Sequence, residues 1–436
     1  MIITRNLTVK HEVDVFVAGG GPAGVAAAYT AAKQGKRVFI AEELGAFGGS
    51  GTCGLVPELM NFDDGKNFLA GGFGAEVFRR AVGDRGEYSR RVYNIKVEEM
   101  KRLYDDLIKE SGAEFSFFTK LVDVEVNNGH IEGVVLAAKQ GLFAVKAKIY
   151  IDCTGDGTLS ALAGAQFELG NAEANGRTMP TTLCSMWANI DFDKKDSLHD
   201  GTFMLEAIED GVIPQYDPLL PGLKAVDREH GIAGGNVGHV FYVDPTDEKS
   251  LTNAMVFGRH LATCYQKYYK EYYKNGCEDI VLIETANILG IRESRRIMGD
   301  KKLTAEYYHS SNVFEDEIGR YSYPKDIHSE TPDEEGAKQF CISVSDHHGV
   351  GESYSIPYGA LIPVGLDNLL TAGKCISADR PMQASVRVIP GCYITGQAAG
   401  VAASLACKSG ETRRVDIREL QSTLVGLGAY LPSFNK

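Results

Sequence analysis

The sequence lacks several features that define other classes of protein. Among its 436 residues there is no run of about 18 apolar residues, which is the length that a membrane-spanning helix needs. The formal net charge is −13 at pH 7 and no basic run occurs, which argues against a nucleic-acid-binding surface because phosphate contacts require clustered Lys and Arg. The N-terminal stretch has no secretory-signal pattern. We therefore expect a cytoplasmic protein that binds neither nucleic acid nor membrane.

Closely spaced cysteines are also missing. The nine cysteines are widely separated, with no CxxC pair and no Cys/His cluster at zinc spacing. A redox disulfide, a structural zinc ion and an iron–sulfur cluster all need thiols that lie close together. The sequence therefore predicts no metal site, and Cys53, in a glycine-rich loop, is expected to be a packing residue.

What the sequence does contain is the stretch VFVAGGGPAG near its N-terminus. Val13 to Ala18 is predicted to be a buried strand, Pro22 to Gln34 an alanine-rich helix, and Arg37 to Ala41 a second buried strand. The glycine motif lies at the turn between the first strand and the helix. This order of elements is typical of a dinucleotide-binding βαβ unit.

The three glycines of the motif and one acidic residue have distinct physical roles. Gly19 permits the tight turn, Gly21 lets a pyrophosphate approach the main-chain amides, and Gly24 lets the helix pack closely on the strand. Glu42 ends the second strand, where a carboxylate can accept hydrogen bonds from both hydroxyls of an adenosine ribose. An acid at this position disfavours a 2′-phosphate. The motif by itself fits NAD or FAD.

Four further glycine-bearing stretches favour FAD. ELGAFGGSGTCG directly follows the second strand, KAKIYIDCTGDGTLSALAG is a predicted strand with a glycine-rich turn, and NLLTAGKCISADRP and SVRVIPGCYITGQAAG lie near the C-terminus. With these stretches the chain resembles the FAD-dependent oxidoreductases of the glutathione reductase superfamily. The resemblance is strongest to the branch that includes fumarate reductase and tricarballylate dehydrogenase flavoproteins.

The resemblance implies a fold and a division of the chain. We expect an α/β protein with a Rossmann-like FAD/NAD(P)-binding domain, an inserted β-meander and a second α+β cap domain. The FAD domain would comprise residues 1–165 and 355–436, and the cap residues 166–354. The helix that begins near Pro390 would point its N-terminus at the flavin. A second GxGxxG motif is missing, so we expect no separate NADPH site.

The motif and the resemblance together assign the cofactor-binding residues. Non-covalent FAD is expected because the GGSGTCG loop offers no histidine for attachment. The assigned residues are Gly19, Gly21, Pro22, Ala23, Gly24, Glu42, Glu43, Gly48, Gly49, Ser50, Thr154, Gly155, Asp156, Gly373 and Gly391.

Other elements follow from their patterns. Val97 to Ser111 has apolar residues at helical spacing, and the meander is predicted as short strands at Leu121–Val126, His130–Ala137 and Gly141–Val145, separate from a strand at Lys146–Asp152. In the cap, Gly238 to Asp244 resembles a strand. A helical run at residues 260–276 carries Tyr265, Tyr268, Tyr269 and Tyr272, which are expected to pack rather than to form a substrate cage.

The candidate catalytic residues come from the cap and from loops that would meet the flavin ring. Arg387 precedes the C-terminal helix and could bind substrate or compensate the charge of reduced flavin. Arg292, with its neighbours Arg295 and Arg296, could hold a carboxylate; the alternative is a structural turn salt-bridged to Glu293 and Asp300. His328 and His348 are the best-placed histidines, and His239 is a weaker candidate.

Three functions fit the sequence. The leading one is an FAD-dependent oxidoreductase that transfers a hydride between a small organic substrate and flavin N5, with an electron acceptor that the sequence does not identify. The second is a flavin- or NAD-binding enzyme without net substrate oxidation, of the tRNA-modifying or thiazole-forming type. The third is a non-catalytic flavin-binding regulator. A homo-oligomer is compatible with each.

Overall fold

The computed structural model describes residues 6–83, 89–218, 222–310 and 312–434. The predicted βαβ unit is present as β1 (Val9–Ala18), α1 (Pro22–Lys33) and β2 (Val38–Ala41). β1 and β2 pair in parallel, as a helical crossover between two strands requires. The unit places the glycine turn at the carboxyl end of β1, which is where open α/β sheets bind their ligands.

The main sheet has the strand order β5-β2-β1-β8-β7-β6, with β17 also paired to β8. Its outer members are β5 (Glu114–Ser116), β6 (Lys120–Asn127), β7 (His130–Ala138) and β17 (Leu369–Thr371). One predicted boundary is wrong: the two strands expected around residue 145 form one continuous strand, β8 (Gly141–Asp152). β8 is long because its start pairs antiparallel with β7 while its end pairs in parallel with β17, and β1 flanks both parts.

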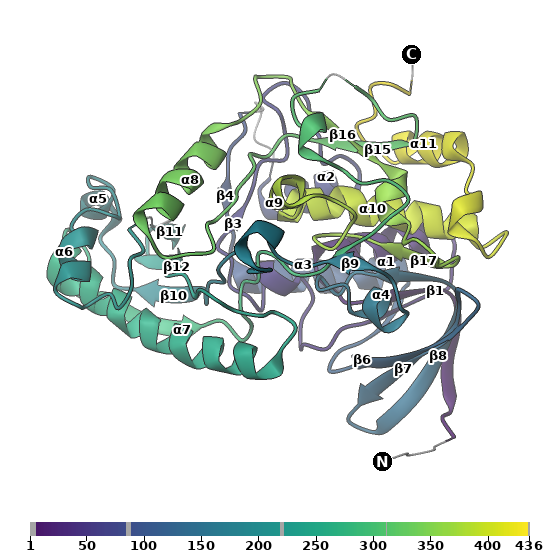
Figure 1. Ribbon diagram of the computed structural model, residues 1–436, viewed down its shortest axis with the longest axis horizontal. Helices are drawn as coiled ribbons and strands as arrows, with labels where there is room; N and C mark the ends of the chain where they lie inside the picture. The colour runs from purple at the N-terminus through teal and green to yellow at the C-terminus, as the bar shows by residue number, and fades with distance from the viewer. Residues whose placement is uncertain (1–5, 84–88, 219–221, 311, 435–436) are drawn as a thin grey trace.

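Alternate residues of the central strands face two different cores. Val15, Val17 and Ile40 lie in a core with helices α1, α3 (Val97–Ser111) and α10 (Ile389–Ala406). Phe16 and Phe39 lie in a second core with the β6–β8 meander. The sheet is therefore covered by helices on one face and by the meander on the other (Figure 1), which explains why its strands read as continuous apolar runs.

A second, four-stranded antiparallel sheet has the order β11-β12-β10-β13. Its strands are β11 (Gly222–Asp227), β12 (Ile232–Asn236), β10 (Ser185–Ala188) and β13 (Val281–Thr285). Helix α7 (Glu248–Tyr268) packs along this sheet, at the far side of the molecule from the meander (Figure 1).

Two expectations for the cap have different outcomes. The run of tyrosines continues from α7 into a π-helical turn at Tyr269–Tyr273. Tyr265, Tyr268 and Tyr269 are fully buried around Trp187, so the prediction that they pack is confirmed. The strand expected at Gly238–Asp244 is wrong, because this segment is irregular and makes one isolated bridge, from Val240 to Thr181.

The remaining helices and strands are short. The helices are α2 (Phe73–Ala81), α4 (Thr158–Leu162), α5 (Phe192–Lys195), α6 (Met204–Glu209), α8 (Glu334–Ser345), α9 (Arg380–Val386) and α11 (Ile417–Gly426). The strands are β3 (Glu58–Leu59), β4 (Tyr93–Asn94), β9 (Phe167–Glu168), β14 (Arg296–Ile297), β15 (Glu317–Tyr321) and β16 (Tyr354–Pro357).

Part of the segment expected in the cap packs against the first core. Leu303, Ile318 and Tyr321 are buried in the same core as α1 and α10. The division of the chain at residues 165 and 354 stays a prediction. The three residues lie within the expected cap segment but contribute to the core that contains α1 and α10. Across the described ranges no single helix is long and apolar enough to cross a membrane. α9 and α10 taken together have the length and apolar composition of a membrane span, but they are bent by 92° at the break between them.

Candidate functional site

The turn between β1 and α1 is tight at two of its glycines and open at the third. A Cβ on Gly19, whose φ is +91°, would lie 2.6 Å from the carbonyl oxygen of Cys153. A Cβ on Gly24 would overlap the carbonyl oxygen of Gly19. A Cβ on Gly21 would meet no atom within 4 Å. Gly21 therefore borders free space at the position where a phosphate is expected.

Two helix N-termini offer unpaired main-chain donors. The N-cap residues of α1 and α10, Gly21 and Val388, provide no side-chain cap, and a proline lies in the first turn of each helix. Within the described part of the chain, the amides of Ala23 and Gly391 have no hydrogen-bond acceptor. Such donors, together with the helix dipole, suit an anionic group.

Glu42 ends β2 and is held in a fixed orientation. Its carboxylate accepts hydrogen bonds from the amides of Gly20 at 2.6 Å and Leu44 at 2.8 Å, and the side chain is buried. Burial raises the pKa of Glu42, although the two amides lower it. The neighbouring Glu43, also expected at the cofactor, forms an ion pair with Lys120 at 3.2 Å, and its side chain is half exposed.

The second glycine loop folds back onto the first. The amide of Gly48 donates to the carbonyl of Gly20 at 2.8 Å. A Cβ on Gly49 would lie 3.4 Å from the Cα of Gly21. Ser50 follows in the same 3₁₀ turn, Gly49–Gly51. The sequence-predicted loop is thus brought against the β1–α1 turn.

The end of β8 is organised by the buried Asp152. Its carboxylate accepts hydrogen bonds from the amide and hydroxyl of Thr154 at 3.1 and 2.7 Å, and from the amide and hydroxyl of Ser160, both at 2.8 Å. This fixes the turn that contains Gly155 and Asp156. Asp156 forms an ion pair with Lys374 at 2.8 Å, which ties the β8 turn to the loop after β17.

The C-terminal segment closes the same cluster. A Cβ on Gly373 would lie 3.1 Å from the Cβ of Ala23, and a Cβ on Gly391 would overlap the carbonyl oxygen of Val386. Segments from both ends of the chain therefore meet at the carboxyl ends of β1, β2, β8 and β17. Glycine approach, free helix amides and an oriented carboxylate are the features that an extended dinucleotide needs.

The sequence matches a family described as FAD dependent oxidoreductase over residues 14–424. The chain belongs to this family. FAD is accordingly its cofactor, and the oxidoreductase fold is the Rossmann-like FAD-binding fold with a parallel sheet described above.

Two curated relatives of this FAD dependent oxidoreductase are thiamine thiazole synthases that match part of the chain. It is 26% identical to the thiamine thiazole synthase of Pyrococcus horikoshii over 164 residues, which covers 35% of this chain and 61% of that protein. It is 31% identical to the thiamine thiazole synthase of Thermotoga maritima over 156 residues, covering 33% of this chain and 58% of that protein. The chain thus spans less than two thirds of the curated relatives it matches.

Among solved structures, the protein is similar to a geranylgeranyl bacteriochlorophyll reductase-like protein from Thermoplasma acidophilum. The two are 14% identical with a TM-score of 0.47, covering 96% of this chain and 84% of the other. A flavin-dependent brominase matches 95% of this chain with 11% identity and a TM-score of 0.44.

Three of the candidate catalytic residues lie in one buried cluster. Arg387, at the C-terminus of α9, donates to the carbonyl and the carboxylate of Asp326 at 3.0 and 3.1 Å. The Asp326 carboxylate also lies 3.2 Å from His328 Nε2. Arg292 donates to the carbonyl of Pro180 at 3.0 Å and to the hydroxyl of Thr182 at 2.9 Å.

Burial sets the charge states of this cluster. Burial, and then the nearby charge of Arg387, lowers the pKa of Arg292 to about 10. Burial, and then the charge of Arg292, lowers the pKa of His328 to about 3. Burial opposes ionisation of Asp326, yet the attraction of His328 and the two arginines holds its pKa well below the usual range. At neutral pH the cluster therefore contains two guanidinium groups, one carboxylate and a neutral imidazole.

The RESRR segment divides between two environments. Glu293 is fully buried and pairs with Arg296 and, at 3.1 Å, with Arg380. This part of the segment forms a structural ion-pair network. It agrees with the alternative interpretation of the sequence, in which the turn is salt-bridged to Glu293. Asp300 is not part of that network, because it pairs with Arg413 at 2.8 Å.

His348 lies apart from these residues. Its ring centroid lies 4.2 Å from that of Tyr308 and 5.3 Å from that of His309. Burial, and then the charge of His309, lowers its pKa to about 4. No contact in the described ranges joins His348 to Arg387 or Asp326, so the structure does not bring it together with the other three candidates.

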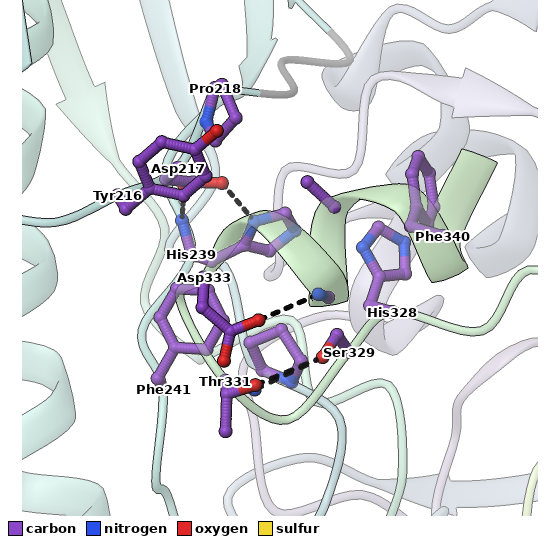
Figure 2. Close-up of a pocket in the computed structure, with 13 residues that line it drawn as sticks. Tyr216, Asp217, Pro218, His239, Phe241, His328, Ser329, Thr331, Asp333 and Phe340 are labelled. Carbon is purple, nitrogen blue, oxygen red and sulfur yellow. Dashed lines mark hydrogen bonds and ion pairs between the residues drawn. The ribbon is translucent and has the colours of Figure 1, made fainter. Parts of the chain in front are cut away.

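Sequence reasoning gave too little weight to His239 and missed Asp217. Both line a pocket with about 340 Å³ of empty space, part of it open to solvent, and His328 lines the same pocket. Figure 2 shows the two imidazole rings with Tyr216, Phe241 and Phe340 around them. Asp217 lies in an irregular stretch before β11 and His239 in one after β12, so no periodic pattern could have identified the pair.

Proposed function

We propose that this protein transfers a hydride between a small organic substrate and N5 of FAD. The observation that carries the proposal is the buried cluster of Arg387, Asp326, His328 and Arg292. This cluster lies at the start of α10, because Arg387 directly precedes the N-cap residue of that helix. The resemblance implies that the α10 N-terminus faces the flavin. Charged and polar groups beside it can orient a substrate and stabilise charge that develops in the reaction.

When bound, FAD supplies the two-electron chemistry. The free amides at the start of α10 would favour negative charge on a flavin ring bound beside them. Arg387 and Arg292 add positive charge nearby, while Asp326 limits it and fixes the Arg387 guanidinium. The neutral His328 can accept or donate a hydrogen bond at the substrate. These roles are those expected of positioning and polarising groups rather than of a redox centre.

The finer grouping is also proposed: the chain would belong beside the fumarate reductase and tricarballylate dehydrogenase flavoproteins. The guanidinium groups of Arg292 and Arg387 are not free to bind a substrate carboxylate. They already donate hydrogen bonds to Pro180, Thr182 and Asp326. A dicarboxylate substrate does not follow from this arrangement. The substrate is proposed as a small organic molecule held between the cap and the FAD domain.

An anaerobic substrate screen that follows flavin absorbance tests the function. The purified protein is expected to be yellow, and one class of small organic molecule should bleach it. Arg387→Ala and His328→Ala should slow that bleaching, while His230→Ala, at an exposed histidine, should not change its rate. Failure of every candidate to reduce the flavin, with bleaching only by dithionite, would favour the regulator. Unchanged rates in both variants would contradict the assigned site.

A further inference from the structure

The strongest unassigned feature is a buried histidine that carries one unsatisfied nitrogen. His239 Nδ1 lies 2.8 Å from Asp217 Oδ1, and the His239 amide donates to Asp217 Oδ2 at 2.9 Å. The histidine is 7% exposed. Its Nε2 is buried and has no hydrogen-bond partner among the described residues. Buried polar atoms nearly always have a partner, so an orphaned one requires an explanation.

Asp217 fixes which nitrogen of the neutral ring carries the proton. Burial raises the pKa of Asp217, but its interactions with His239 more than offset this and hold the pKa below its usual value. An ionised carboxylate can only accept hydrogen bonds. Nδ1 is therefore the donor, and Nε2 of the neutral ring presents a lone pair. In that neutral form the orphaned atom is a hydrogen-bond acceptor that lacks a donor.

The pocket that His239 lines has mostly apolar walls. Phe241, Phe340, Pro180, Pro218 and Ala337 provide these walls. Among the described residues, the charged side chains that line it are the carboxylates of Asp217 and Asp333, while Arg292 donates to the carbonyl of the lining residue Pro180. The carboxylates repel anions, and the apolar walls make the desolvation of any ion costly. An uncharged molecule fits these walls best.

The pocket is also connected to the proposed reaction site. The His239 and His328 rings are 4.9 Å apart between centroids and nearly perpendicular. His328 lines the pocket and contacts Asp326, which in turn holds Arg387. Two side chains, those of His328 and Asp326, thus separate the pocket from Arg387.

We propose that this pocket binds a small, uncharged, largely apolar molecule through an O–H or N–H group that donates a hydrogen bond to His239 Nε2. Identifying that molecule as the substrate rests on the proposed function. Alcohols, phenols and uncharged amines are the classes that combine such a donor with an apolar body. His239 then contacts the substrate, and Asp217 is a positioning residue that acts through it.

Phenol and toluene are matched probes for this site, because they have the same number of heavy atoms and only phenol has an O–H donor. Binding to the FAD-loaded protein can be measured by ligand-observed NMR titration. Phenol is expected to bind about three- to tenfold more tightly than toluene, which is the range for one hydrogen bond to a buried acceptor. Equal affinities in the wild-type protein would overturn the proposal.

His239→Phe should remove the preference for phenol, and His230→Phe should leave it intact. The control is close, because His230 also pairs with an aspartate, Asp227, at 3.0 Å but is exposed. A preference that survives in His239→Phe would place the phenol contact elsewhere and refute the assignment. Thermal melting of each variant checks that it is folded.

Ala337→Phe provides a test that leaves the buried pair untouched. Ala337 is partly exposed on α8 and lines the pocket, so a larger side chain there should fill the space and abolish binding of both probes. Gln339→Phe, on the same helix but outside the pocket, should bind both normally. Binding of phenol that persists in Ala337→Phe would contradict the location. These titrations do not depend on flavin reduction, so a negative substrate screen would reject the proposed function and leave the pocket standing.

Discussion

Gly396 of α10 lies directly against Ala23 of α1: a Cβ on Gly396 would overlap the Ala23 carbonyl oxygen. One turn further along, a Cβ on Gly400 would lie 2.5 Å from the carbonyl oxygen of Ala27. Small residues on both helices therefore let the two backbones touch. Because α1 and α10 each present free amides at their N-termini, this crossing sets how the two helix N-termini are placed relative to each other.

We predict that Gly396→Ala destabilises the protein by about 1–3 kcal/mol, which is typical of overpacking in a closely packed core. Gly426→Ala in α11 is the control, because a Cβ there would meet nothing within 4 Å. Urea unfolding followed by circular dichroism measures both. If the two variants unfold at the same urea concentration, the close crossing is not a structural constraint.

Gly21→Ala separates cofactor binding from folding. The added Cβ meets no protein atom within 4 Å, and the φ of −65° at this residue suits alanine, so the free energy of unfolding of the apoprotein should change by less than about 0.5 kcal/mol. The same methyl group would occupy the space where the pyrophosphate approaches the backbone. FAD content after purification and the affinity of the apoprotein for added FAD should both fall.

Gly24→Ala is the comparison for that experiment. Here the Cβ would overlap the Gly19 carbonyl oxygen, so both the fold and FAD binding should suffer. A Gly21→Ala protein that keeps its full complement of FAD would show that the dinucleotide does not pass this residue.

Asp326→Asn should be strongly destabilising. The substitution leaves the buried guanidinium of Arg387 without its carboxylate, and breaking a buried pair from one side costs about 3–5 kcal/mol. The double variant Asp326→Asn/Arg387→Met removes both charges and should recover part of that loss. Thermal or urea unfolding of the single and double variants gives the coupling energy, and purely additive effects would show that the pair is not coupled.

His328 should make the protein less stable as the pH falls from 7 to 5. Its folded-state pKa is lowered from 6.5 to about 3, so over this range the unfolded chain takes up a proton that the folded protein does not. The stability linked to the neutral ring is present above pH 6.5 and is lost below it, by about 2 kcal/mol at pH 5.

His328→Gln should remove this part of the pH dependence, and His230→Gln, at the exposed histidine, should not. The free energy of unfolding of each protein at pH 7, 6 and 5 provides the measurement. Parallel pH profiles for wild type and His328→Gln would mean that His328 is accessible to protons in the folded state.

Much of the FAD domain could be predicted because its signals are local. The β1–α1 turn follows from glycine spacing, and α3 was predicted with the bounds observed, because its apolar residues recur at helical spacing over 15 residues. The two strands predicted within β8 are one strand. Its neighbour changes from β7 to β17 along its length, and local sequence spacing does not show that the strand continues through this change.

The cap was harder to predict because its contacts are not periodic. The strand expected at Gly238–Asp244 is irregular, since the segment pairs with Asp217 through His239 instead of joining the neighbouring sheet. From sequence position alone, His348 and His328 are equal candidates. Only the fold separates them, because His328 packs against His239 while His348 packs against Tyr308.

The sequence by itself determined that the chain has a βαβ unit with a glycine turn, an acid at the end of its second strand and helices rich in small residues. These properties depend on the backbone freedom of glycine and on spacing along a single strand or helix. The tertiary structure alone decided that Arg387, Asp326, His328 and Arg292 share one buried site, and that His239 faces a pocket with an unsatisfied nitrogen. Burial and the charges of neighbours from distant segments set those properties, and neither is encoded in local spacing.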